Sequence, residues 1–219
     1  MDYVYNKEVN IPVGKVKVEG ELIIPQKANG IVVFSHGSGS SRLSPRNQMV
    51  ARYLHEHHFG TLLFDLLTPE EDRHYHNRFD IDLLTKRLAG ATEWLGALPA
   101  AKKSRIGYFG ASTGAASALK AAAILPGNIS AVVSRGGRPD LAMGSLPMVE
   151  APVLLIVGEL DHDVLQLNRL AYDRLVCEKK IEIIPGATHL FEEQGAMDKV
   201  AASAAAWFEK YLQPAAVHQ

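Results

Sequence analysis

Residues 106–119 read IGYFGASTGAASAL, and this stretch decides the fold class. The apolar residues 106–109 are typical of a buried β-strand. The alanine-rich residues after Ser112 favour a helix, which Pro126-Gly127 would end. Between the two lies Gly110-Ala111-Ser112-Thr113-Gly114, a short turn with glycines on both sides of a serine. The stretch therefore predicts one strand–turn–helix unit of an α/β domain.

Strands of the same kind recur along the chain. Most of the apolar runs are continuous rather than alternating with polar residues, which is typical of parallel strands covered by helices on both faces. The expected strands are residues 31–34, 61–64, 105–109, 129–133, 153–157 and 181–184.

Helical patterns separate these strands. Ser44-Pro45 offers an N-cap and a proline suited to the first helical position, and we expect Gly60 to end that helix. Further helices are expected over 81–95, after Ser112, after Asp163 and near the C-terminus. The apolar faces of the last two are expected to carry Val164, Leu167, Leu170 and Leu175, and Val200, Ala204, Trp207, Phe208 and Tyr211.

The first 30 residues differ from the rest, because Val16, Val18 and Leu22 are interleaved with charged residues. This pattern predicts antiparallel edge strands over 1–30. Residues 1–219 show no internal repeat or linker, so we expect one α/β domain with a doubly wound, mostly parallel sheet. Residues 214–219 are expected to form a disordered tail.

Composition narrows the function classes. The chain is 47% hydrophobic and 21% charged, which excludes a disordered or collagen-like chain. Lys plus Arg is 23 against 24 Asp plus Glu, so no overall field attracts nucleic acid or anionic lipid, and we expect neither as a partner. A single cysteine, Cys177, permits no internal disulfide. The N-terminus shows no secretion signal, so we expect a cytoplasmic protein.

Three residues at strand ends suggest nucleophilic catalysis. A serine hydroxyl is a weak nucleophile, and it needs a histidine base that is itself oriented by a carboxylate. Ser112 follows the strand at 105–109, Asp161 follows the strand at 153–157, and His189 follows the strand at 181–184. The carboxyl ends of parallel strands meet at one edge of a sheet. We therefore expect Ser112, Asp161 and His189 to form a catalytic triad. Asp163 is the less favoured acid, because Asp161 lies nearer the end of the strand and Asp163 could instead be the N-cap of the next helix.

The same chemistry needs donors for an oxyanion. One is the backbone N–H of the residue after the nucleophile, here Thr113, and the other comes from the loop after an early strand. We expect the second donor to be the N–H of Ser38, with that of Gly39 as the alternative.

Four segments carry a family resemblance: HGSG at 36–39, GASTG at 110–114, GELD at 158–161 and GATH at 186–189. In this order they resemble the α/β-hydrolase superfamily, and within it the small lidless branch around the dienelactone hydrolases. The resemblance implies an eight-stranded, mostly parallel sheet without a cap domain. It also implies hydrolysis of esters, lactones or thioesters through an acyl-enzyme, with no cofactor. Dienelactone hydrolases proper use a cysteine nucleophile, so Ser112 argues against dienelactone itself as the substrate.

Residues 134–140, SRGGRPD, are also similar to a hydrolase group sometimes joined to a phosphoribosyltransferase domain. Arg135 and Arg138 follow a strand and approach the active edge. Two interpretations stay open: the guanidinium groups bind an anionic part of the substrate, or they pair with Asp140, Glu150 or Asp161 to hold loops.

Other residues near this edge are weaker candidates for substrate binding. They include His36 and Asp65, although Asp65 is better explained as a hydrogen-bond acceptor that orders a loop. Residues 66–80 could form a partial lid over an open, shallow pocket. His55, His57 and His58 lack the carboxylate spacing of a metal motif, so we expect no metal.

The expected partner of a serine esterase is a small-molecule substrate, and whether the protein forms a homodimer stays open. Two other functions remain as alternatives to the esterase. One is an α/β-hydrolase-like binding module without activity. The other is a nucleotide-binding oxidoreductase, because GASTG also resembles a dinucleotide-binding turn. That turn should follow the first strand, whereas here half the chain precedes it.

Overall fold

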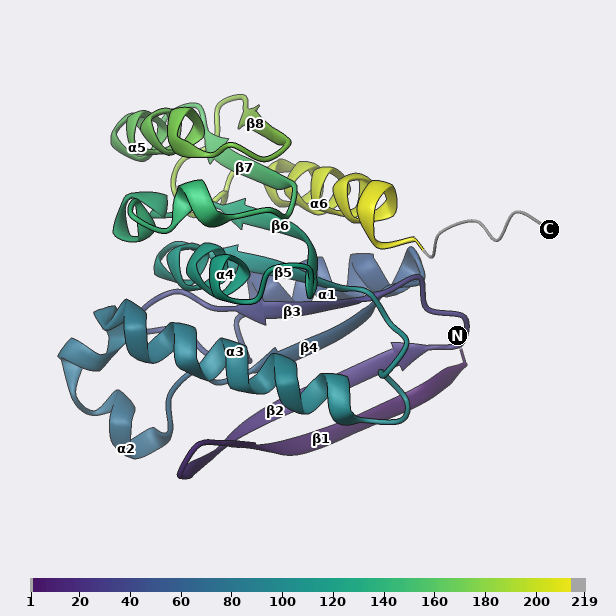
Figure 1. Ribbon diagram of the computed structural model, residues 1–219. Coiled ribbons are helices and arrows are strands. Elements are labelled where there is room, and N and C mark those ends of the chain that lie inside the picture. Colours follow the sequence, from purple (N-terminus) through teal and green to yellow (C-terminus); the bar gives the residue numbers. More distant parts are fainter. Residues whose placement is uncertain (1, 214–219) are drawn as a thin grey trace.

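The computed structural model describes residues 2–213, so the tail expected at 214–219 lies outside the described residues. Eight strands form one sheet in the order β1-β2-β4-β3-β5-β6-β7-β8 (Figure 1). β1 (Tyr3–Val13) pairs antiparallel with β2 (Val16–Pro25), and β2 is also antiparallel to β4 (Gly60–Phe64). The other strands run parallel to β4 and are β3 (Ile31–Ser35), β5 (Ile106–Ala111), β6 (Ile129–Arg135), β7 (Val153–Gly158) and β8 (Lys179–Ile184). The predicted α/β class and eight-stranded, mostly parallel sheet are confirmed.

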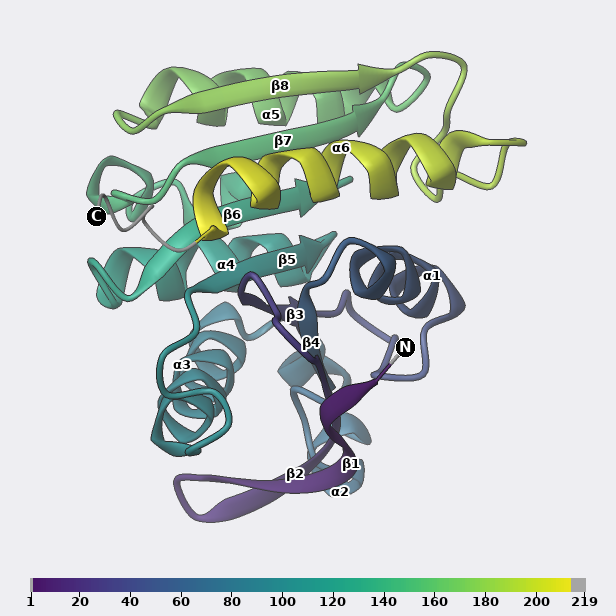
Figure 2. The same cartoon turned by 90° about the vertical axis from the view of Figure 1, so that its right-hand side faces the viewer.

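Helices cover both faces of the sheet, as Figures 1 and 2 show. α1 (Pro45–Glu56) and α6 (Ala196–Leu212) pack on one face, and α3 (Ile81–Ala97), α4 (Thr113–Ile124) and α5 (His162–Arg174) pack on the other. Within β3, Ile31 and Val33 face the second layer while Val32 and Phe34 face the first. Because both of their faces are buried, β3 to β7 are largely continuous apolar runs rather than alternating ones.

The start of α1 is as predicted, but its end is not. Ser44 Oγ accepts from the Asn47 N–H at 3.4 Å, as an N-cap does. The helix ends at Glu56, and His58 turns the chain with a φ of 61°. Gly60 is instead the first residue of β4, where an added Cβ would lie 3.1 Å from the Ile23 carbonyl oxygen. Its small size serves strand packing rather than helix termination.

The apolar face predicted for α5 is wrong at one position. Leu170 is 56% exposed, whereas Asn168 is fully buried. The Asn168 amide donates to the Gly137 carbonyl oxygen at 3.0 Å and to that of Val164 at 2.8 Å. The helix thus uses an inward position to satisfy the backbone of the loop after β6, which a hydrophobic pattern cannot reveal.

Residues 66–80 form short helices that the sequence analysis did not predict: α2 (Pro69–Asp72) and the 3₁₀ helix η1 (Tyr75–Phe79). Thr68 and Glu71 form a reciprocal capping box at the start of α2. Glu71 also pairs with Arg87 of α3, and Asp72 pairs with Arg78. The segment is therefore folded onto the domain. Two more 3₁₀ helices, η2 (Pro139–Ala142) and η3 (Leu146–Met148), follow β6.

Among residues 2–213, every helix is too short or too polar to cross a membrane.

Candidate active site

Ser112 occupies a strained turn between β5 and α4. Its φ is 51° and its ψ is −121°, a conformation rare for a residue with a side chain. A Cβ added to Gly110 would lie 2.5 Å from Ala115 Cα, and one added to Gly114 would lie 2.1 Å from the Ser35 carbonyl oxygen. Only glycine fits at both positions. The turn thus holds Ser112 at the N-terminus of α4, where the helix dipole favours negative charge.

Asp161 and His189 come from the loops after β7 and β8. These loops pack closely, because a Cβ on Gly158 would lie 2.4 Å from the Ala187 carbonyl oxygen. His189 Nδ1 lies 2.6 Å from Asp161 Oδ2. Asp161 is 13% exposed and His189 is 39% exposed, so the imidazole reaches solvent while the carboxylate lies behind it. Asp163 is exposed in the first turn of α5.

Ser112 and His189 line the same cavity, which has a volume of about 240 Å³. Gly37 forms its wall next to the serine, because a Cβ at that residue would lie 3.2 Å from Ser112 Cβ. Arg135 also lines it. The remaining lining residues are Ser38, Ser40, Ser44, Arg46, Asn47, Ala111 and Leu190. The structure thus brings the three predicted catalytic side chains to one edge of the sheet.

The two N–H groups expected to be oxyanion donors differ in whether they already have a hydrogen-bond acceptor in the structure. Within residues 2–213, the Thr113 N–H has no protein acceptor. The Ser38 N–H, expected to be the second oxyanion donor, donates to Thr113 Oγ1 at 2.8 Å. Ser38 lines the cavity, whereas Gly39 does not. The sequence analysis did not predict that the Thr113 hydroxyl would accept from the Ser38 N–H.

His36 and Asp65 brace loops and do not line the cavity of Ser112. His36 Nδ1 lies 2.9 Å from the Gly37 carbonyl oxygen, and its Nε2 accepts from the Leu66 N–H at 3.0 Å. Burial lowers the pKa of His36, so the ring is neutral with a proton on Nδ1. Asp65 accepts from the Arg42 backbone N–H at 2.7 Å and from its guanidinium at 2.8 Å. Both residues line a neighbouring cavity of about 130 Å³ instead, so their expected part in substrate binding stays a prediction.

The two arginines after β6 behave differently. Arg138 makes two hydrogen bonds of 2.8 Å to Asp140, which is the loop-holding interpretation. Arg135 is 6% exposed, lines the cavity and has no carboxylate partner within residues 2–213. Its neighbours there include Arg46 and Asn47, which the sequence analysis did not single out. The signal was available, because both residues lie in the first turn of a helix that starts at the active edge.

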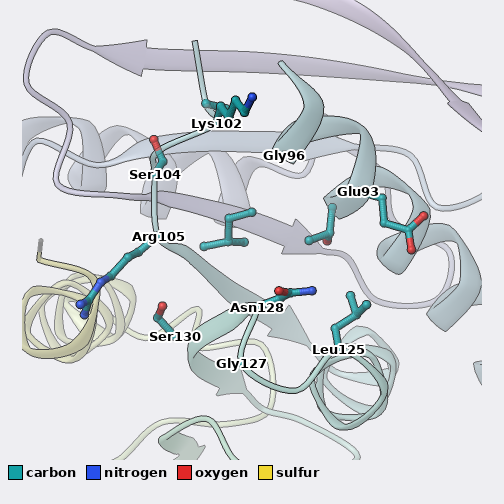
Figure 3. A pocket seen from close by; sticks show the side chains of 12 residues that line it. Glu93, Gly96, Lys102, Ser104, Arg105, Leu125, Gly127, Asn128 and Ser130 are labelled. Carbon is teal, nitrogen blue, oxygen red and sulfur yellow. The ribbon is translucent and has the colours of Figure 1, made fainter. Parts of the chain in front are cut away.

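A second cavity of about 500 Å³ opens at the opposite edge of the sheet. Figure 3 shows its wall, which includes Glu93 of α3, Lys102, Arg105 and Asn128. It lies at the amino ends of β5 and β6 and its lining contains no histidine, so it offers no serine–histidine pair. In residues 2–213, His, Cys, Asp and Glu side chains nowhere cluster in threes in a way that could hold a metal ion.

Comparison with known proteins agrees with this geometry. The fold and the strand-to-helix turn define an α/β hydrolase. Residues 18–214 match the dienelactone hydrolase family, and the chain belongs to this family. A dienelactone hydrolase from Anabaena variabilis ATCC 29413 is 52% identical, with a TM-score of 0.95 over 97% of this chain and 100% of that one. Est1E from Butyrivibrio proteoclasticus shares the fold, with a TM-score of 0.80 at 15% identity over 93% of this chain and 98% of that one.

Two curated relatives carry a different name. Proteins of Mycobacterium tuberculosis strains CDC 1551 / Oshkosh and ATCC 25618 / H37Rv, provisionally named phosphoribosyl transferases, are 54% identical over 207 residues. The match covers 94% of this chain and 47% of each relative, so the chain spans about half the length of the relatives it matches.

Proposed function

We propose that the protein is a serine hydrolase that cleaves carboxylic esters, lactones or thioesters through an acyl-enzyme. The observation that carries this proposal is one cavity lined by both the strained Ser112 and His189, with His189 Nδ1 2.6 Å from Asp161 Oδ2. Membership of a hydrolase family supports it. It also argues against a nucleotide-binding oxidoreductase.

Each group has a defined role in the proposed reaction. Ser112 Oγ attacks the acyl carbonyl carbon while His189 Nε2 takes its proton, and Asp161 holds the proton on Nδ1 and stabilises the imidazolium. The carbonyl oxygen becomes an oxyanion, which the Thr113 N–H stabilises, and the Ser38 N–H becomes the second donor by exchanging its bond to Thr113 Oγ1 for one to the oxyanion. His189 then protonates the departing alcohol. Water attacks the acyl-enzyme with the same base, which releases the acid and restores Ser112.

Hydrolysis of p-nitrophenyl acetate by wild type and Ser112→Ala tests this function. We expect the variant to lose activity by about 10⁶-fold, with a melting temperature close to that of wild type. A fluorophosphonate probe should label wild type covalently and leave Ser112→Ala unlabelled. An unlabelled, inactive wild type would favour the binding module, and activity retained in Ser112→Ala would refute the mechanism.

A further inference from the structure

Arg135 presents an unpaired positive charge next to the proposed nucleophile. It is the last residue of β6 and pairs in register with Ala111 of β5. Its carbonyl oxygen accepts from the Ser112 N–H at 3.2 Å, so the same backbone contact places both residues. The guanidinium lines the cavity that Ser112 and His189 share.

The side chains around the Arg135 guanidinium do not neutralise its positive charge. One Nη donates to Asn47 Oδ1 at a long 3.3 Å, and the group lies 5.9 Å from the centre of the Phe191 ring. Its Nε is buried without any protein acceptor. Within residues 2–213, no Asp or Glu pairs with it, whereas Arg138 three residues later is held by Asp140. Burying a charge without a partner is costly, so something other than this domain's own side chains is expected to compensate it.

A second guanidinium faces the same cavity. Arg46 lies in the first turn of α1. Among residues 2–213 its buried Nε has no partner, and its one ion pair is a 3.4 Å contact with the exposed Glu192. Burial and the charge of Arg46 lower the pKa of Arg135 to about 10, which still leaves it protonated at neutral pH. Two arginines that repel each other across one small cavity create a positive site that an anion would neutralise.

We propose that Arg135 and Arg46 form an anion subsite within the catalytic cavity, and that the substrate is an ester carrying a carboxylate or phosphate group. This inference deepens the proposed function and rests on it. A planar guanidinium can make two parallel hydrogen bonds to either anion. The buried Arg135 provides the main contact, and Arg46, 37% exposed in its side chain, closes the site from the rim.

Matched esters of different charge provide the test. Para-acetoxybenzoate and its methyl ester differ in a charge on the leaving group, and mono-p-nitrophenyl succinate and its methyl ester differ in a charge on the acyl group. Para-acetoxyphenyl phosphate replaces the carboxylate with a phosphate and so distinguishes the two anions. We expect wild type to prefer at least one anionic ester over its neutral partner in kcat/KM.

The variants are Arg135→Met, Arg46→Met and the control Arg138→Met. Loss of Arg135 should lower the anionic-to-neutral ratio of kcat/KM by about 10- to 150-fold, which corresponds to one hydrogen-bonded charge contact. Arg46→Met should lower it less, and Arg138→Met should leave it unchanged. A ratio that is the same in all four proteins would overturn the subsite. So would a fall in melting temperature in Arg135→Met with equal loss on both esters.

A binding measurement separates this inference from the proposed function. Benzoate or phosphate, compared with chloride at equal ionic strength, should raise the melting temperature of Ser112→Ala but not that of Ser112→Ala/Arg135→Met. If wild type hydrolysed none of the esters, this stabilisation would leave the subsite standing and refute the proposed esterase. Efficient turnover of neutral and anionic esters alike, with no stabilisation by either anion, would support the esterase and refute the anion subsite.

Discussion

The backbone N–H of Ser38 donates to Thr113 Oγ1 at 2.8 Å, and this bond joins two loops whose residues are 75 positions apart. One loop follows β3 and the other begins α4, so the contact sets the distance between the two backbone segments that face an oxyanion. Thr113 therefore has two separate roles in the proposed site: its N–H is a donor, and its hydroxyl holds the second donor in place.

Thr113→Val tests the role of the hydroxyl. The valine keeps the volume and the backbone N–H but removes the acceptor of the Ser38 N–H. Without this bond the loop that carries Ser38 is no longer held against Thr113, so we expect kcat for p-nitrophenyl acetate to fall by about 10²-fold, as when an oxyanion donor is misplaced, while KM changes little. Thr113→Ser keeps the hydroxyl and should stay near wild type. Equal rates in the two variants would show that the bond has no role in catalysis.

Asp161→Asn tests the acid. The amide cannot hold the proton on His189 Nδ1 or stabilise the imidazolium, so we expect kcat to fall by about 10⁴-fold. Asp163→Asn is the matched control, because this exposed carboxylate lies two residues away, in the first turn of α5, whose N-cap is Asp161. Its activity should be close to that of wild type. Loss of activity in the control alone would assign the acid to Asp163.

The small cavity predicts a preference for short acyl chains. Its volume of about 240 Å³ is below the range typical of drug-sized ligands, and its lining consists mainly of glycine, serine and charged residues. We expect kcat/KM for p-nitrophenyl esters to be highest for acetate to butyrate and to decrease toward palmitate. Soluble substrate concentrations must be used, so that micelle formation does not imitate this decrease. A steady increase with chain length would contradict the proposed pocket.

The sequence predicted the positions of the proposed catalytic residues because a simple rule governs them. Parallel strands end at one edge, so Ser112, Asp161 and His189 had to approach each other once their strands were recognised. Which of Arg135 and Arg138 pairs with a carboxylate could not be predicted in this way. Whether an arginine meets a carboxylate depends on the path of a loop, and here Asp140 turns back onto Arg138 only. The bond from Ser38 to Thr113 depends on the same kind of detail.

The glycines of the turn provide a prediction on stability. In Gly114→Ala, the new methyl group would lie 2.1 Å from the Ser35 carbonyl oxygen, and backbone cannot give way cheaply. We expect the free energy of unfolding to decrease by about 3 kcal/mol or more, measured by denaturant unfolding. Gly96 of α3 is the control, because a Cβ there meets no atom within 4 Å. Gly96→Ala should stabilise the protein by about 0.5–1 kcal/mol, since alanine favours the helix.

Two buried histidines predict how stability depends on pH. Burial lowers the pKa of His36, and burial together with the charge of Arg52 lowers that of His55 to about 4. In the unfolded chain both take up a proton near pH 6.5. Between about pH 4 and 6.5 the unfolded state thus binds more protons than the folded state, so the free energy of unfolding rises with pH across this window and falls on acidification.

Replacing His55, whose Nε2 lies 2.8 Å from Thr61 Oγ1, by glutamine keeps a polar partner but removes the titrating group. Denaturant unfolding at a series of pH values should show a slope smaller by about one proton in His55→Gln, with no difference in slope between the two proteins above pH 7. An identical slope below pH 6.5 would mean that His55 takes up its proton equally well in the folded state.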